Sequence, residues 1–407
     1  MASSAGLTRP PAQTPPAGAV LWRVTPTGLP GATVTQRDDL EPTDSEETTP
    51  IESDVDRRDF LMRLGAALAA TATLSVSPEA QAATKKPGKG YVLRVHHSGA
   101  TTDITKTNDE VVKTLVAEAL KRFTGAATPG EAMKQFVKPT DIVGVKINTL
   151  GSPFSSVNPA TAFAVAEAVH AAGVPKDKVI IYDQYGSRMT TGGFRPLPRG
   201  VKPKPGNFPV HNHKTMGYEE DDTLTDGRTR RDEPAKVKLA KIARHLTAVI
   251  NVCCPKDHDL TGVTGALKNV AYGNIETVPS FHCSREKCKP TCYHDGLCNI
   301  PRVYSHEQLG GKVRLVICDA VRVLYHGGPQ DKRWREAMNE VAITTDPVAM
   351  DRCILDWVET IRKAKGMSSV WEDRDGTRAP RFIEAAGKMG LGEADLKKIT
   401  QERVSIG

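Results

Sequence analysis

A run of polar residues between positions 251 and 269 carries the side chains best suited to chemistry. It reads Asn-Val-Cys-Cys-Pro-Lys-Asp-His-Asp-Leu-Thr-Gly-Val-Thr-Gly-Ala-Leu-Lys-Asn. His258 can act as an acid, a base or a metal ligand near neutral pH, and Lys256 and Lys268 can stabilise developing negative charge. The run therefore predicts a catalytic group of His258, Lys268 and Lys256.

The same run predicts a turn that binds an anion. Its glycines and threonines favour a tight turn into a helix, and the backbone N–H groups of such a turn can bind negative charge. Together with two residues that end an earlier strand, the turn gives a predicted substrate-binding set for an anionic small molecule: Lys146, Asn148, Asp257, Thr264, Gly265 and Asn269. The nucleotide-binding patterns G-x-x-x-x-G-K-[ST] and G-x-G-x-x-G are absent from this run. The alternative is an ordinary solvated loop between a strand and a helix.

Four cysteines form a second candidate site. Cys283, Cys288, Cys292 and Cys298 follow one another closely, in the spacing C-x4-C-x3-C-x5-C, and His282 comes directly before them. Four thiolates from one short loop can hold an iron–sulfur cluster or another metal such as tetrahedral zinc. The sequence therefore predicts a metal or an iron–sulfur cluster at these five residues. The alternatives are a pair of disulfides, which an oxidising compartment favours, and free thiols.

The pattern of apolar residues predicts strands that alternate with helices. Buried runs predict strands at 91–97, 141–148, 178–183, 246–253, 313–319 and 341–345. Helical spacing predicts helices at 108–123, 159–172, 262–272 and 347–363. This alternation is typical of an α/β fold with a mostly parallel sheet and helices on both faces. Ligands bind at the carboxyl ends of strands in such sheets, which is where the polar run begins.

The segment 1–82 differs from the rest of the chain in composition. It contains no cysteine and carries a net charge of −5, which leaves +12 on the remainder of the chain. Arg57 and Arg58 precede a short, mildly apolar run that ends in Ala80-Gln81-Ala82. This order is typical of a twin-arginine signal peptide after a disordered lead. It predicts the Tat export machinery as a partner and a periplasmic or extracellular location.

The remaining residues predict one α/β domain with additions. The domain spans 90–362 and contains a Gly/Pro-rich insertion at 187–234, in which His211 and His213 could bind a metal. A Cys-rich loop follows at 282–299, and a C-terminal helical extension at 363–407. No apolar stretch reaches the roughly 18–20 residues of a membrane span, so no stable span is expected. Scattered basic residues and few aromatic ones argue against nucleic acid as a partner.

Several stretches resemble one known family. The run VINV-x-x-x-K-D-H-x-L-T-G-V-T-G-A-L-K-N is similar to the signature of domain of unknown function 362. Further matching stretches lie at 141–148, 172–175, 317–320, 327–329 and 345–349, so the resemblance spans about residues 90–362. It implies an α/β fold, and often an exported or iron–sulfur-associated protein. It implies no known reaction.

A shorter stretch resembles the nickel-pincer lactate racemases. His258, a Gly-rich turn, Lys268, Glu276-Thr277 and His282 follow one another in a similar order. In those enzymes the lysine is linked to the pincer cofactor, and the later histidine helps to bind nickel. The resemblance is confined to the stretch 258–282 of this chain.

Two classes of function follow from these patterns. One is an exported enzyme, dependent on a metal or an iron–sulfur cluster, that performs redox or isomerase-type chemistry on an anionic small molecule. The other is a non-catalytic binding protein of the cell envelope, in which disulfides staple the cysteine loop. In the first class the four cysteines bind a metal or a cluster and His258 is needed for activity. In the second class the cysteines form disulfides and His258 is not needed.

Overall fold

The computed structural model describes residues 88–220, 237–276, 299–373 and 378–407, together with 227–228, 234–235, 278, 282 and 376. The predicted signal peptide and Cys283, Cys288, Cys292 and Cys298 lie outside the described residues. Within the described part of the chain, no helix combines the length and the apolar character needed to cross a membrane.

The described strands form one large sheet and two short hairpins. Their bounds are β1 (Tyr91–His96), β2 (Thr101–Asp103), β3 (Lys106–Thr107), β4 (Val143–Lys146), β5 (Val179–Asp183), β6 (Val210–Asn212), β7 (Gly227–Arg228), β8 (Pro234–Ala235), β9 (Ala248–Cys253), β10 (Lys256–His258), β11 (Gly262–Thr264), β12 (Val313–Leu324), β13 (Arg335–Thr344) and β14 (Thr400–Ser405).

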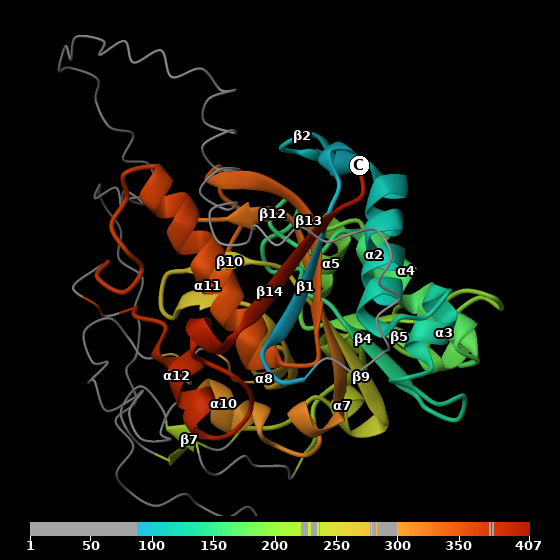
Figure 1. Ribbon diagram of the computed structural model, residues 1–407. Coiled ribbons are helices and arrows are strands. Elements are labelled where there is room, and N and C mark those ends of the chain that lie inside the picture. Colours follow the sequence, from blue (N-terminus) through green and yellow to red (C-terminus); the bar gives the residue numbers. More distant parts are fainter. Residues whose placement is uncertain are drawn as a thin grey trace, which may run out of the picture. The chain divides into compact units, whose positions relative to one another are not determined.

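The large sheet is mixed but mostly parallel. Its order is β14-β1-β13-β12-β9-β4-β5-β6, and β10 joins it beside β12. The pairs from β12 through β9, β4 and β5 to β6 are all parallel, whereas β13 is antiparallel to both β1 and β12. The structure thus confirms the predicted α/β class, with the antiparallel pairs confined to one half of the sheet (Figure 1).

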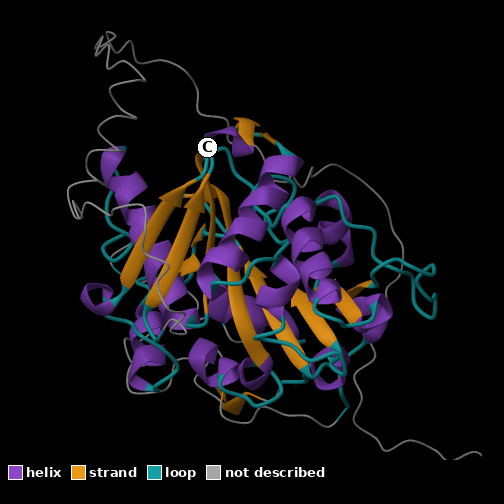
Figure 2. Ribbon diagram, turned by 45° about the vertical axis from the view of Figure 1, so that its right-hand side comes forward, coloured by secondary structure: helices purple, strands orange, loops and turns teal. Residues whose placement is uncertain are grey.

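Helices cover both faces of the sheet. Their bounds are α2 (Asp109–Thr124), α3 (Pro129–Met133), α4 (Pro159–Ala171), α5 (Gly186–Thr191), α6 (His213–Met216), α7 (Lys241–His245), α8 (Ala266–Ala271), α10 (Asn299–Tyr304), α11 (Pro347–Ala364) and α12 (Arg381–Lys388). Side chains of α2, α3 and α4 share one apolar core with the sheet, and those of α8, α10, α11 and α12 share another. Figure 2 shows the strands as a twisted layer between these helices.

Alternation along the strands explains the two cores. Leu315 and Ile317 of β12 enter the core with α2 and α4, whereas Val316 and Cys318 enter the core with α11. Successive side chains of a strand point to opposite faces, so a strand covered on both sides must be apolar throughout. This is why the buried strands are readable as continuous apolar runs.

Local signals set the helix ends. Asp346 accepts hydrogen bonds from the N–H groups of Val348 and Ala349, 3.0 and 2.9 Å long, and Pro347 begins α11. A capping aspartate followed by proline at the first helical position is a common start of an α-helix. Gly173, with φ of 106°, follows the end of α4 in the left-handed region that glycine adopts easily.

The structure differs from the sequence predictions at three places. Residues 262–264 of the predicted helix form β11, residues 266–271 form the α-helix, and Tyr272 begins a 3-10 helix. The insertion at 187–234 contributes β6, which pairs with β5 in the sheet. The extension at 363–407 contains α12 but also β14, which pairs with β1 along its whole length.

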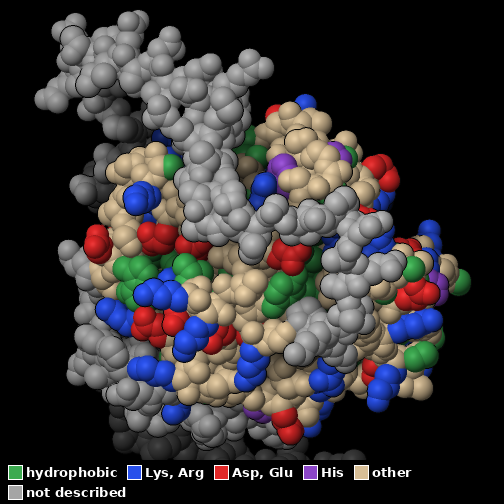
Figure 3. Space-filling view, viewed as in Figure 1, with side chains coloured by type: hydrophobic (Ala, Val, Ile, Leu, Met, Phe, Trp, Pro, Cys, Tyr) green, Lys and Arg blue, Asp and Glu red, His purple; other side chains and the backbone are tan. Residues whose placement is uncertain are grey.

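On the face shown in Figure 3, basic and acidic side chains are interspersed, so positive charge is not gathered there.

Candidate active site

A pocket opens at the carboxyl ends of β4, β5 and β10. It holds about 510 Å³ of space, including its open mouth. Its walls come from four segments far apart in the sequence, which the sheet order brings together. The lining residues are Lys146, Asn148, Leu150, Asp183, Gln184, Tyr185, Lys256, His258, Thr264, Lys268, Asn269, Tyr272, Gly273, Val278, His282 and Pro329. The pocket therefore lies where a parallel α/β sheet is expected to bind its ligand.

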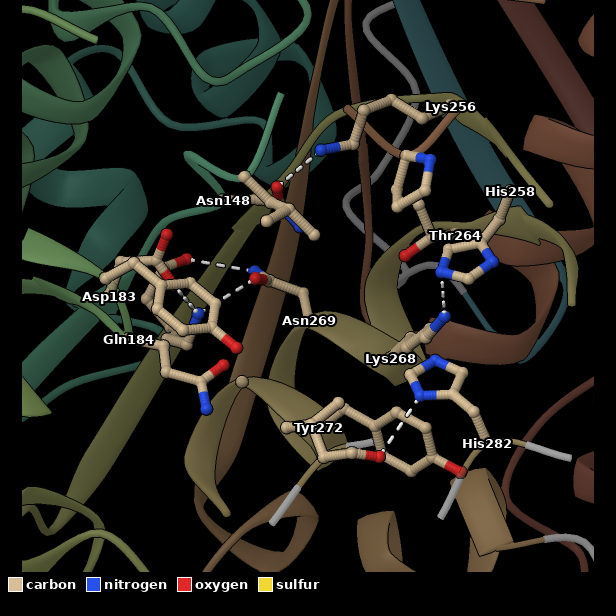
Figure 4. A pocket seen from close by; sticks show the side chains of 16 residues that line it. Asn148, Asp183, Gln184, Lys256, His258, Thr264, Lys268, Asn269, Tyr272 and His282 are labelled. Atoms are coloured by element: carbon tan, nitrogen blue, oxygen red, sulfur yellow. Dashed lines mark hydrogen bonds and ion pairs between the residues drawn. The ribbon is translucent and has the colours of Figure 1, made fainter. Parts of the chain in front are cut away.

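The β10–β11 hairpin places two cationic or titratable side chains on the same side. Because successive residues of a strand alternate, Lys256 and His258 both face the pocket, and Asp257 faces away from it. The Asp257 carboxylate instead accepts hydrogen bonds from Arg378 Nη1 (2.7 Å) and the Gly328 N–H (3.0 Å). Figure 4 shows Lys256 and His258 pointing into the same space.

His258 and Lys268 form the tightest contact in the pocket. The Nε2 atom of His258 lies 2.5 Å from Nζ of Lys268, and both side chains are buried. The Leu260 N–H donates to His258 Nδ1 over 3.0 Å. That bond assigns the proton of a neutral imidazole to Nε2, where it faces the lysine nitrogen. Lys268 also donates to Thr261 Oγ1 over 3.2 Å.

Asp259 offers a competing partner to the same ring nitrogen. Its Oδ1 atom lies 3.4 Å from His258 Nδ1 and would favour a proton there. The Leu260 N–H is the stronger partner, because its donor is fixed in the backbone and the distance is shorter, whereas the Asp259 side chain is 37% exposed. A partly solvated carboxylate at that distance has a weak hold on the proton.

The surroundings keep His258 neutral. Burial lowers the pKa of His258 well below its usual value, and the nearby positive charges of Lys256 and Arg378 lower it further. A charged imidazolium would stand among like charges in a site of low polarity. A neutral imidazole with a depressed pKa can accept a proton only from an unusually placed or activated donor, such as a ligand held against it.

Two rings flank this pair. The His282 ring stacks on His258 with centroids 5.4 Å apart and an interplanar angle of 8°. Tyr272 meets His282 edge-on at 4.9 Å, and Lys268 Nζ lies 5.6 Å from the Tyr272 ring centre. Lys268 lies on α8 four positions before Tyr272, so the two share one helical face. That spacing is a signal for Tyr272 that the sequence interpretation passed over.

A buried ion pair forms the floor of the pocket. Lys146 donates three hydrogen bonds, to Asp183 Oδ1 (2.7 Å), the Ile147 carbonyl (2.7 Å) and Asn269 Oδ1 (2.9 Å). The Asp183 carboxylate also accepts from the N–H and the hydroxyl of Thr149. Burial alone would raise the pKa of Asp183, but Lys146 and Thr149 outweigh it and lower that pKa. Burial also lowers the pKa of Lys146, but all three of its N–H donors have acceptors, so the geometry is that of an ammonium paired with a carboxylate.

Asn269 ties the floor to the strands. Its Nδ2 atom donates to Asn251 Oδ1 over 2.8 Å and to the Val252 carbonyl over 3.2 Å, and its Oδ1 atom accepts from Lys146. The first turn of α8, which carries both Lys268 and Asn269, is thereby fixed to the ends of β4 and β9. Both the oxygen and the nitrogen of the Asn269 amide therefore make hydrogen bonds that hold the floor of the pocket together.

Asp351 of α11 holds the beginning of α8. Its carboxylate accepts hydrogen bonds from the N–H groups of Ala266 and Leu267, the second over 3.1 Å. Gly265 lies against the same carboxylate, and a Cβ atom at that position would overlap with Asp351 and Ile354. The close approach of α11 therefore requires glycine at position 265 and sets the place of Lys268.

The structure brings most of the predicted site residues together. The pocket is lined by all three predicted catalytic residues and by His282, together with four of the predicted substrate-binding residues: Lys146, Asn148, Thr264 and Asn269. Asp257 and Gly265 belong to the same predicted set, but the structure puts both outside the pocket lining. Asp257 is on the opposite side of β10, and Gly265 packs on α11.

The predicted metal site at the cysteines lies outside the described residues, apart from His282. Among the described residues, no group of three or more His, Cys, Asp or Glu side chains is placed to hold a metal ion. The described cysteines, Cys253, Cys254, Cys318 and Cys353, are buried free thiols. His211 and His213 are not part of such a group either.

Comparisons with solved structures give weak similarities. One match is to the crystal structure of a protein from Thermotoga maritima, with 13% identity and a TM-score of 0.36. The match covers 64% of this chain and 60% of the Thermotoga maritima chain. The lactate racemase apoprotein from Thermoanaerobacterium thermosaccharolyticum covers 61% of this chain and 53% of its own, at 13% identity and a TM-score of 0.31. This chain thus spans about 60% of the length of the first of these two structures and about half of the second.

The sequence itself gives the decisive match. No curated protein matches the chain. A family model with the description "Domain of unknown function (DUF362)" matches residues 143–356, from the first strand of the pocket to the middle of α11. That match covers more than half of the chain and includes every pocket-lining residue. The chain therefore belongs to the DUF362 family.

Proposed function

We propose that this protein is an enzyme that moves a proton to or from a small anionic molecule bound in the pocket. One observation carries the proposal: His258 Nε2 and Lys268 Nζ lie 2.5 Å apart inside the pocket. Two basic nitrogens at hydrogen-bond distance share a proton, and a ligand that enters beside them can exchange one with the pair. A purely structural histidine has no need of a lysine as its partner.

The proton positions define the roles. With its Nε2 proton directed at Lys268, the His258 imidazole donates and the Lys268 nitrogen accepts, which it can do only as a neutral amine. Lys268 is then the base nearest to a ligand: its amine takes a proton from the ligand, becomes an ammonium and returns the proton from the same nitrogen, while His258 stays neutral and its Nε2–H orients the amine. The buried ammonium of Lys256 supplies the positive charge that stabilises a developing anion.

A resident cofactor is also part of the proposal. The short resemblance to nickel-pincer enzymes involves one lysine and one later histidine, and Lys268 and His282 both line the pocket. The donor types therefore fit a metal-bearing group that these two residues would hold. Such a group supplies an electron-pair acceptor that side chains lack. The cysteine loop remains a separate proposed place for a metal or an iron–sulfur cluster.

Exchange of solvent deuterium tests the proton-transfer role. The protein, purified without oxygen from cells that export it, is incubated in D₂O with small 2-hydroxy, 2-amino and 2-oxo carboxylates, and loss of the proton next to the carboxylate is followed by NMR. We expect exchange with at least one compound, and a reduction of about 10²–10⁴-fold in His258→Gln. The matched control is His245→Gln, because His245 is exposed and outside the pocket.

Absence of exchange from the whole panel, in protein that binds one of these compounds, would contradict the proposal and favour the binding-protein alternative. Equal exchange in His258→Gln and in the wild type would also contradict it, because the reacting pair would then be elsewhere.

Elemental analysis together with a visible spectrum tests the cofactor. A stoichiometric metal that is lost in Lys268→Met and His282→Gln supports a group in the pocket. A metal lost only when Cys283 and Cys288 are replaced by serine places it in the cysteine loop. A colourless protein without metal in the wild type would contradict both parts and leave acid–base chemistry by side chains alone.

A further inference from the structure

The two lysines on the strand side of the pocket differ in their charge balance. Lys146 is neutralised by Asp183, and all three of its N–H donors have acceptors. Lys256 is equally buried, with 1% of its surface exposed. Its hydrogen bond within the described residues is to Asn148 Oδ1, a neutral amide oxygen 2.5 Å away. No carboxylate pairs with Lys256 in that part of the chain.

The neighbouring acidic side chains are engaged elsewhere. Asp257 faces the other side of β10 and binds Arg378. Asp183 binds Lys146 and Thr149. The Cys254 thiol is no substitute, because burial raises its pKa and keeps it protonated. A buried charge without a counter-charge is costly, so the fold maintains Lys256 in a state that a ligand's negative charge would stabilise.

Asn148 adds a second hydrogen-bond donor next to the Lys256 ammonium. Because its Oδ1 atom accepts from Lys256, its Nδ2 group is directed away from the ammonium and toward the pocket that both residues line. An ammonium with two remaining N–H donors, next to an amide N–H₂, can bind the two oxygens of one carboxylate. Figure 4 shows this pair on one wall and the His258–Lys268 pair on the next.

We propose that Lys256 and Asn148 form a subsite for the carboxylate of a monocarboxylic substrate. This inference rests on the proposed function and specifies its substrate class. With Lys146 neutralised by Asp183, His258 kept neutral and Lys268 a neutral amine in the proposed pair, Lys256 is the uncompensated charge among these groups. One negative charge balances it. A phosphate monoester or a dicarboxylate would carry a second negative charge into the buried pocket, so both are excluded as good ligands.

A carboxylate held there also orients the rest of the molecule. The carbon next to the carboxylate extends from the Lys256–Asn148 wall toward His258 and Lys268, which is the position that proton exchange requires. The subsite thus makes the proton next to a carboxylate the one that the pair can reach. Tyr185, 42% exposed, stands at the mouth, where larger substituents would meet it.

Binding of simple probes tests the subsite without any turnover. Acetate, acetamide and inorganic phosphate are titrated into the protein and followed by ligand-observed NMR. Acetamide has the shape of acetate without its charge. We expect acetate to bind at least tenfold more tightly than acetamide or phosphate, and Lys256→Met to lose that preference. Lys113→Met, at an exposed position on α2, is the matched control and should behave as the wild type.

Asn148→Asp provides a second variant in case Lys256→Met does not fold. It places a carboxylate beside Lys256, so the charge is balanced within the protein and acetate binding should be lost while the fold is retained. Tighter binding of phosphate than acetate in the wild type would overturn the inference. So would acetate binding that is unchanged in both Lys256→Met and Asn148→Asp.

His258→Gln separates this inference from the proposed function. Acetate should bind this variant as well as it binds the wild type, because the subsite is intact, although proton exchange is lost. If the wild type binds acetate through Lys256 but exchanges no proton in any carboxylate, the subsite stands and the proposed proton transfer fails. If exchange occurs but is unaffected by Lys256→Met, the proton transfer stands and the subsite is overturned.

Discussion

At the scale of single residues, the pocket depends on charges that are buried and must be matched. Lys146 and Asp183 are both almost fully buried, and each provides the other's counter-charge. Taking two charges out of water is costly, and the attraction between them offsets that cost only while both are present. The arrangement is therefore sensitive to the loss of either partner.

Removal of one partner of the Lys146–Asp183 pair should destabilise the fold strongly. We expect Lys146→Met or Asp183→Asn to lower the free energy of unfolding by about 3–5 kcal/mol, because one buried charge is left alone. Urea unfolding followed by circular dichroism measures this. The Lys113–Glu110 pair on α2 is exposed, so Lys113→Met should leave the unfolding midpoint unchanged. Equal midpoints for Lys146→Met and Lys113→Met would refute the buried-pair account.

His213 should make the fold sensitive to acid. It is fully buried, both ring nitrogens are without hydrogen-bond partners in the described structure, and burial together with Lys146 lowers its pKa to about 3. Below pH 6.5 the unfolded chain binds a proton that the folded chain does not, so stability falls as the pH falls toward 3. The loss from His213 between pH 7 and pH 5 is about 2 kcal/mol.

Urea unfolding at pH 7 and pH 5 checks this prediction. The difference in stability between the two pH values should be about 2 kcal/mol smaller in His213→Phe than in the wild type. The exposed His245 gives the control, because His245→Gln should leave the difference as it is in the wild type. A pH dependence that is identical in His213→Phe and the wild type would show that His213 is not buried neutral.

At the scale of elements, α8 and the β10–β11 hairpin carry the reacting residues, and distant segments hold both in place. Asp351 of α11 binds the beginning of α8. Arg378, from the segment before α12, binds both Asp257 Oδ1 (2.7 Å) and the His258 carbonyl (3.0 Å). Arg378 lies beyond residue 356, where the family match ends. The C-terminal extension therefore positions a hairpin of the core domain.

Close packing of α8 on α11 should make position 265 intolerant of any side chain. A Cβ atom on Gly265 would overlap with Asp351 and Ile354, so Gly265→Ala should cost about 1–3 kcal/mol and displace Lys268. Thermal unfolding measures the stability, and proton exchange measures the effect on the site. Gly311→Ala is the control, because a Cβ atom there meets its neighbours at 3.7 Å or more. Similar melting temperatures for the two variants would contradict this packing.

Arg378 should act as a positioning residue for His258. In Arg378→Met the buried Asp257 retains only Arg362, 3.8 Å away, as a charged partner. We expect a loss of about 3–5 kcal/mol in stability, faster amide hydrogen exchange in β10 and β11, and partial rescue of both by Arg378→Lys. Arg381→Met is the control, since Arg381 binds a loop carbonyl outside the hairpin. Unaltered exchange in β10 would show that Arg378 does not hold the hairpin.

At the scale of the whole molecule, what the sequence predicts well is what local patterns encode. Buried strands covered by helices on both sides read as apolar runs, so β4, β5, β9 and β12 are predicted near their true positions. Because ligands of such sheets bind at the carboxyl ends of strands, the sequence then predicts that Lys146, Lys256 and His258 lie together at one edge of the sheet. This is why half of the pocket lining can be named before its geometry is known.

What the sequence does not predict depends on pairing between distant segments. Strand β14 is largely polar and exposed, and it is a strand because it pairs with β1, which lies far away in the sequence. Strand β11 exists because the chain turns back on β10. That turn also sends Asp257 to Arg378 instead of to the ligand, which the run of polar residues alone could not show. Asp351, which binds the beginning of α8, could not be singled out from the sequence, because it lies within an amphipathic helix.

The proposed chemistry depends most on one state: His258 as a neutral imidazole with its proton on Nε2, shared with Lys268 in the pocket. Nitrogen NMR of protein labelled with ¹⁵N-histidine observes that state between pH 5 and pH 8, with His258→Gln to assign the signals. We predict one Nε2-protonated, neutral ring that does not titrate in this range, and whose shifts change in Lys268→Met. An imidazolium at pH 7, or a proton on Nδ1, would contradict this assignment.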